Sequence, residues 1–69
     1  MNISTKFGKK VKEIRLKKFL SQGKLAKILK LHPTYISGIE RGVRNLSLKN
    51  IEKLAKALNV KIKDFFNES

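Results

Sequence analysis

The stretch that decides the fold is SQGKLAKILKLHPTYISGIERG, residues 21–42. Ser21 is a residue type that caps helices, and apolar residues follow it at helical spacing as far as Lys30. Leu31-His32-Pro33 interrupts this pattern, because proline disfavours a helical conformation in the residue before it and suits the first turn of a new helix. Gly42 is expected to end that new helix in a left-handed conformation. The stretch therefore predicts two short helices joined by a tight turn.

Three further helices are predicted around this pair, over residues 5–18, 48–59 and 61–67. Ser4 or Thr5 is expected to cap the first of them and Ser47 the second. Phe19 is expected to flank the apolar stripe of the first helix. No segment alternates with the period of two that indicates a strand. We therefore predict an all-α fold, five helices around one small core, with residues 1–69 forming a single domain.

The charge of the chain indicates a polyanionic partner. Seventeen Lys and Arg residues face five Asp and Glu residues, a net charge of +12. Nucleic acid is the first expectation and an anionic membrane surface the second. The alternative is a lysine-rich surface that is only solvated and binds no partner. There is no cysteine, and His32, the single histidine, is expected to cap a helix rather than bind a metal. No run approaches the roughly 18 apolar residues of a membrane span, so a cytoplasmic protein is expected. No metal and no cofactor are expected.

Several positions then carry a resemblance to a known family. Gln22 begins the first motif helix, and Ala26 is small where the two helices would cross. Ile36 is expected to pack the second helix into the core, and Ile39-Glu40-Arg41-Gly42 forms a closing signature. In these features the chain resembles the helix-turn-helix proteins related to phage Cro and repressors, called XRE-type. The run from Tyr35 to Asn45 is most similar to the controller proteins of restriction-modification systems, which are small dimers that regulate their own operon. The resemblance implies a phage-repressor-like DNA-binding domain with its motif at about residues 21–41.

The resemblance also implies which residues touch DNA. It places the base-reading positions on the second motif helix, at Pro33, Thr34, Ser37 and Gly38. It gives the DNA backbone contacts to Ser21, Gln22, Lys24, Tyr35, Arg41, Arg44 and Asn45. For Thr34 and Ser37 the alternative is that they are ordinary helix-surface residues. For Tyr35 the alternative is packing on the core, and for Arg44 it is exposure to solvent without a contact to DNA. Gly38 weakens a helix interior but would let the helix approach DNA closely.

Two structural roles are expected as well. Arg15 is expected to form an ion pair with Glu40 that braces the motif, as in the family. Lys30 stands where the family usually has glycine and would be held in a left-handed conformation. Ile62, Phe65 and Phe66 are expected to form apolar surface at a dimer interface.

The predicted function is sequence-specific binding of double-stranded DNA by a homodimer. Two-fold symmetry implies a roughly palindromic operator with recognition helices about 34 Å apart. Binding there would activate or block RNA polymerase. An antitoxin or phage-type repressor whose main partner is another protein, and an RNA reader, remain the alternatives. No catalytic residues are predicted, because no paired acid and base, activated nucleophile or phosphate-cradling glycine loop occurs.

Overall fold

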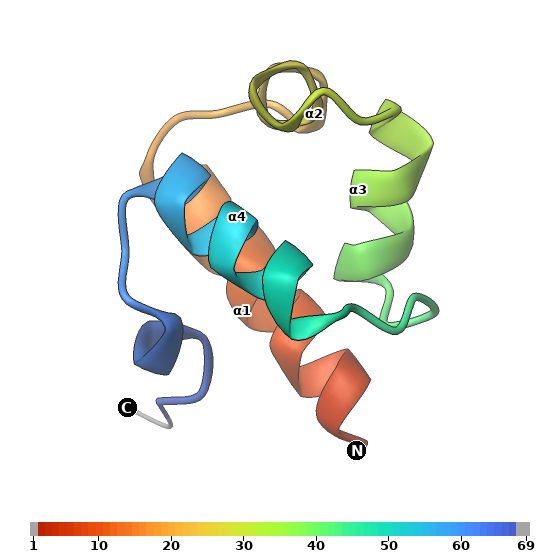
Figure 1. Ribbon diagram of the computed structural model, residues 1–69, viewed down its shortest axis with the longest axis vertical. Coiled ribbons are helices and arrows are strands. Elements are labelled where there is room, and N and C mark those ends of the chain that lie inside the picture. The colour runs from red at the N-terminus through yellow and green to blue at the C-terminus, as the bar shows by residue number, and fades with distance from the viewer. Residues whose placement is uncertain (1, 68–69) are drawn as a thin grey trace.

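The computed structural model describes residues 2–67 and contains only helices within that range (Figure 1). The elements are α1 (Ile3–Lys17), α2 (Gln22–Leu29), α3 (Pro33–Glu40), α4 (Leu48–Leu58) and a short 3₁₀ helix, η1 (Ile62–Phe65). The all-α prediction is confirmed. The fifth helix differs from the prediction because its four residues form a single tight turn rather than an α-helix.

The helix starts follow from side-chain caps. The hydroxyl of Ser21 accepts a hydrogen bond from the Lys24 backbone N–H at 3.0 Å, and Ser47 caps α4 in the same way. The prediction that Ser4 or Thr5 caps the first helix is wrong. The Asn2 side chain is the cap and accepts a hydrogen bond from the Thr5 N–H at 2.8 Å, so α1 begins earlier than expected.

Among residues 2–67, four adopt a left-handed backbone, and each ends a helix or follows its end. Lys30 (φ 59°) and Asn59 (φ 57°) terminate α2 and α4, and Gly42 (φ 77°) follows α3. The left-handed conformations of Lys30 and Gly42 are as predicted. Phe19 (φ 58°) follows α1, where the Leu20 N–H donates to the Arg15 carbonyl. This turn leaves the Phe19 side chain 94% exposed, so its expected place beside the apolar stripe is wrong.

The core lies where α1, α2, α3 and α4 meet. Its largest fully buried side chains are Val11, Leu25, Ile36, Leu54 and Leu58. Phe65 is also buried, 2% exposed, and its ring meets that of Phe7 edge-on with 5.1 Å between centroids. The expectation that Phe65 supplies dimer surface is therefore wrong, because its side chain completes the core of its own chain.

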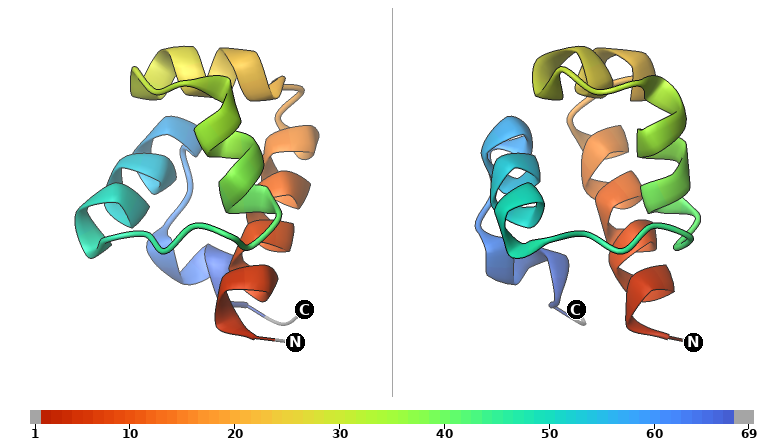
Figure 2. Two further views of the ribbon diagram at one scale, coloured as in Figure 1. Left: turned by 90° about the vertical axis from the view of Figure 1, so that its right-hand side faces the viewer. Right: turned by 45° about the vertical axis from the view of Figure 1, so that its right-hand side comes forward.

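The packing leaves one side of α3 uncovered. This helix packs against α1 and α2, and α2 lies across its beginning (Figure 2). Gly8 allows the α1 contact, since a Cβ there would lie 2.7 Å from the Glu40 carbonyl oxygen and overlap that of Ile39. In the left view of Figure 2, no other helix stands in front of α3. Within residues 2–67, every helix is too short or too polar to cross a membrane.

Candidate nucleic-acid interface

A buried ion pair fixes the C-terminal end of α3. Arg15 of α1 donates from Nε to Glu40 Oε2 at 2.6 Å and from Nη2 to Oε1 at 3.0 Å. Its Nη1 donates to the Leu20 carbonyl at 2.7 Å. The Arg15 and Glu40 side chains are 7% and 3% exposed. The two-pronged geometry suits a planar guanidinium and a carboxylate, and holds α3 against α1.

Gln22 extends this pair into a network. Its Nε2 donates to Glu40 Oε1 at 3.0 Å, so one carboxylate ties together α1, α2 and α3. The sequence interpretation assigned Gln22 only to the DNA backbone and missed this role. The position at the start of α2 gave no signal for it, because the contact depends on how α2 and α3 pack.

The exposed face of α3 begins at its cap. His32 Nδ1 accepts a hydrogen bond from the Thr34 N–H at 3.1 Å, and Pro33 occupies the first helical position. Pro33 and Thr34 are exposed and Ser37 is half-buried. Thr34 and Ser37 are three residues apart and share one face of the helix. That face therefore presents two hydroxyl groups beside the positive end of the helix dipole.

The loop after α3 folds back over the same helix. The Arg44 guanidinium carbon lies 5.2 Å from the centre of the Tyr35 ring, a cation–π arrangement. Tyr35 is half-buried and packs on the core, which is one of the two roles considered for it. Gly38 is buried beneath the side chains of Arg44 and Val43. Its predicted role in base reading is therefore wrong, because the space above it is already occupied by protein.

The other candidates for backbone contact are exposed: Ser21, Lys24, Arg41, Arg44 and Asn45. They lie at the start of α2, at the end of α3 and in the loop that follows. The Ser21 hydroxyl is engaged in capping but retains donor capacity. The structure thus places these residues around the two motif helices, and their contact with DNA stays a prediction.

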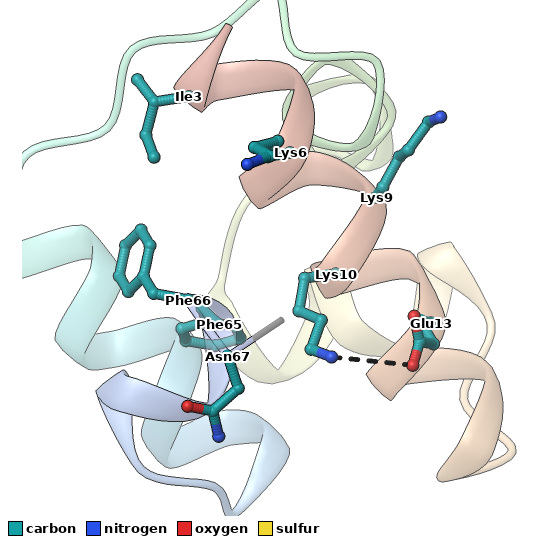
Figure 3. A pocket seen from close by; sticks show the side chains of 8 residues that line it. All are labelled: Ile3, Lys6, Lys9, Lys10, Glu13, Phe65, Phe66 and Asn67. Atoms are coloured by element: carbon teal, nitrogen blue, oxygen red, sulfur yellow. Dashed lines mark ion pairs between the residues drawn. The ribbon is translucent and has the colours of Figure 1, made fainter. Parts of the chain in front are cut away.

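A second exposed surface lies between the start of α1 and η1. Ile3 and Phe66 line an open hollow of about 500 Å³ there, and their side chains lie on the same side of it (Figure 3). Both also line an adjoining hollow of about 240 Å³ with Ile51. Phe66 is 46% exposed and Ile62, on η1, is 44% exposed. No cluster of metal-ligating side chains occurs in the part of the chain that the structure describes.

Comparisons with known proteins agree with this geometry. Residues 11–65 match the helix-turn-helix family. The chain is 58% identical to the control protein C.BamHI of Bacillus amyloliquefaciens over 67 residues, which cover 96% of this chain and 83% of that protein. The restriction-modification controller protein C.AhdI of Aeromonas hydrophila superposes with a TM-score of 0.86 at 47% identity, over 90% of this chain and 94% of that one.

A further solved structure is similar over most of its length. It is the tetramer of the restriction-modification controller protein C.Esp1396I in complex with its natural 35 base-pair operator. Its TM-score is 0.83 at 42% identity, and the match covers 96% of this chain and 88% of that one.

Proposed function

The chain belongs to the helix-turn-helix family and, within it, to the restriction-modification control proteins, and on that premise we propose that it regulates transcription by binding a specific operator in double-stranded DNA. The observation that carries the proposal is the uncovered face of α3, which is braced from behind by the Arg15–Glu40–Gln22 network. The function is binding rather than catalysis, and a protein that acts on operator DNA works in the cytoplasm.

The proposed contact is insertion of α3 into the major groove. This groove is about 12 Å wide and accepts one α-helix. Thr34 and Ser37 meet base edges, where each hydroxyl can donate or accept and the threonine methyl can touch a thymine methyl. The register on the DNA is fixed by contacts with the sugar-phosphate backbone from Ser21, Lys24, Arg41, Arg44 and Asn45. Gln22 adds a contact through the amide atoms that its hydrogen bond to Glu40 does not use.

We infer that a dimer of this chain binds the operator. The solved C.Esp1396I assembly is a tetramer on its operator, which supports binding as an oligomer. Two copies of this chain pair through apolar surface that includes Ile62 and Phe66, both of which remain exposed in the single chain. Two-fold symmetry then sets half-sites about 10 base pairs apart, centre to centre, in a roughly palindromic operator. Such a site near a promoter lets the dimer assist or block RNA polymerase.

The test begins with selection of bound duplexes from a random pool, followed by titration of the best site by fluorescence anisotropy. If six to ten phosphates are neutralised, affinity falls by about 10³ to 10⁵ between 50 and 200 mM salt. Thr34→Ala should relax the preference at particular base pairs. Recovery of no preferred duplex, or stable binding only to another protein, would refute the proposal.

A matched pair of lysine variants separates specific placement from overall charge. Lys24 lies at the start of α2, whereas Lys63 lies on η1, and both side chains are exposed. Lys24→Ala should reduce the slope of log affinity against log salt by about one. Lys63→Ala removes the same charge and should leave that slope nearly unchanged. Equal slopes for the two variants would remove the start of α2 from the interface.

A further inference from the structure

Gly38 is an unusual residue for the interior of a short helix. Glycine destabilises a helix relative to alanine, and α3 has only eight residues. Its backbone dihedrals do not require glycine, since Gly42, which follows the helix, is the glycine with a positive φ in the described chain. The reason for a glycine at position 38 must therefore lie in what a side chain there would touch.

The three nearest atoms outside α3 that a Cβ at position 38 would meet all belong to side chains. It would lie 2.9 Å from Cγ of Arg44, 3.3 Å from Nε of Arg44 and 3.6 Å from a methyl group of Val43. Gly8 differs in kind, because a Cβ there would collide with backbone carbonyls of α3. Since Arg44 is a flexible side chain in a loop, an alanine at position 38 displaces Arg44 rather than the helix.

The other end of the Arg44 side chain is also held. Its guanidinium lies over the ring of Tyr35, which is three residues before Gly38 and so on the same side of α3. The stem of Arg44 thus crosses the helix at the position that lacks a side chain and ends on an aromatic face. We call this arrangement of Tyr35, Gly38 and Arg44 the arginine slot.

We propose that Gly38 is a positioning residue whose missing side chain lets the slot order Arg44 on the surface of α3 before DNA arrives. The inference rests on the proposed function, because it assumes that Arg44 contacts DNA. An unheld arginine must lose rotamer freedom when it binds, and the slot removes part of that loss in advance. Gly38→Ala should therefore weaken operator binding roughly 2- to 12-fold, the range expected for ordering one long side chain.

A double-mutant cycle tests whether the effect passes through Arg44. Operator affinity is measured by anisotropy for the wild type, Gly38→Ala, Arg44→Ala and the double variant. Gly38→Ala should weaken binding only while Arg44 is present, so the double variant should bind like Arg44→Ala. Gly23→Ala is the matched control for a methyl group added to a helix, because the nearest atom to a Cβ there is the Ser21 hydroxyl at 3.9 Å. Any effect of Gly23→Ala on affinity should be the same with and without the Arg44 side chain.

A second measurement needs no DNA. The Arg44 guanidinium lies over the Tyr35 ring, so the ring current of Tyr35 shifts the Arg44 side-chain protons. Tyr35→Leu separates this shift from any contribution of Phe7 and Phe66, which line a hollow with Arg44. These NMR shifts should move toward random-coil values in Gly38→Ala, with thermal stability equal to or above that of the wild type. Gly23→Ala should not alter them.

The outcomes separate the two proposals. Unchanged Arg44 shifts in Gly38→Ala would overturn the slot. So would an affinity loss that persists in the Arg44→Ala background, because the new methyl group would then obstruct DNA directly. If the wild-type chain selects no operator but Gly38→Ala still releases Arg44, the proposed function fails and the ordering of Arg44 stands.

Discussion

Replacing Glu40 with alanine tests whether the polar network behind α3 holds the fold together. The Glu40 carboxylate accepts hydrogen bonds from Arg15 Nε, Arg15 Nη2 and Gln22 Nε2. Glu40→Ala removes all three acceptor contacts at once. The Arg15 side chain is only 7% exposed, and within residues 2–67 its guanidinium keeps the Leu20 carbonyl as its hydrogen-bond acceptor.

The expected loss of stability follows from that geometry. Hydrogen bonds to a charged group contribute about 1.5–3 kcal/mol each, and removing one member of a buried pair costs about 3–5 kcal/mol because the other charge is left buried. A domain of this size rarely has more than about 3–5 kcal/mol of stability in total. Glu40→Ala should therefore be largely unfolded at 25 °C without a stabilising osmolyte.

Urea unfolding followed by far-ultraviolet circular dichroism measures the effect, with sucrose added to populate the folded variant. With a urea slope of about 1 kcal/mol per molar, the midpoint should fall by about 3 M or more. Glu13→Ala is the matched control. Glu13 is half exposed and pairs with Lys10 and Lys17 at 3.8 and 3.4 Å, so its loss should cost less than about 1 kcal/mol.

Equal midpoint shifts for Glu40→Ala and Glu13→Ala would refute the reasoning, because they would mean that water solvates Arg15 as soon as its partner is gone. A second variant guards against a simple cavity effect. Replacing both Arg15 and Glu40 with leucine removes the stranded charge, so it should recover much of the stability that Glu40→Ala loses.

Other substitutions test the backbone of the fold by thermal and urea unfolding, followed by far-ultraviolet circular dichroism. Phe19→Gly should stabilise by about 1 kcal/mol and raise Tm by about 4–8 °C, because Phe19 is left-handed and 94% exposed; an unchanged or lower Tm would show that its side chain makes a stabilising contact. Gly8→Ala should destabilise strongly by forcing α1 from α3, whereas Gly23→Ala should stabilise by up to about 1 kcal/mol, and similar values for both would contradict the close crossing. His32→Ala should cost about 1 kcal/mol as the α3 cap is lost, and a neutral effect would argue against the cap.

Local signals in the sequence were sufficient for most helix boundaries. Ser21, Pro33 and Gly42 act through backbone preferences that need no distant partner, and the structure places α2 and α3 accordingly. The left-handed Lys30 was implied by the family resemblance, because the family usually has glycine at this position. The burial of Phe65 could not be predicted in this way, because it depends on the ring of Phe7 from the other end of the chain.

The site residues also divide into those whose surroundings follow from local sequence and those whose surroundings depend on tertiary structure. Thr34 lies on the exposed face of α3 because helical periodicity fixes its direction. Gln22 and Gly38 have neighbours that only tertiary structure defines: Gln22 meets a carboxylate on another helix, and Gly38 is covered by a side chain from the following loop. A single sequence carries no local pattern for either contact.

The network and the arginine slot should respond differently to mutation, although both act on α3. The network lies inside the fold and joins three helices, so weakening it should lower stability and DNA affinity together, since a loosened α3 must be ordered again on binding. The slot lies on the surface and holds one side chain, so Gly38→Ala should lower affinity while stability stays level or rises. A set of variants plotted as affinity against stability should therefore place Glu40→Ala and Gly38→Ala on separate trends. A single shared trend would mean that Arg44 is ordered by the fold as a whole and that the glycine contributes only through helix stability.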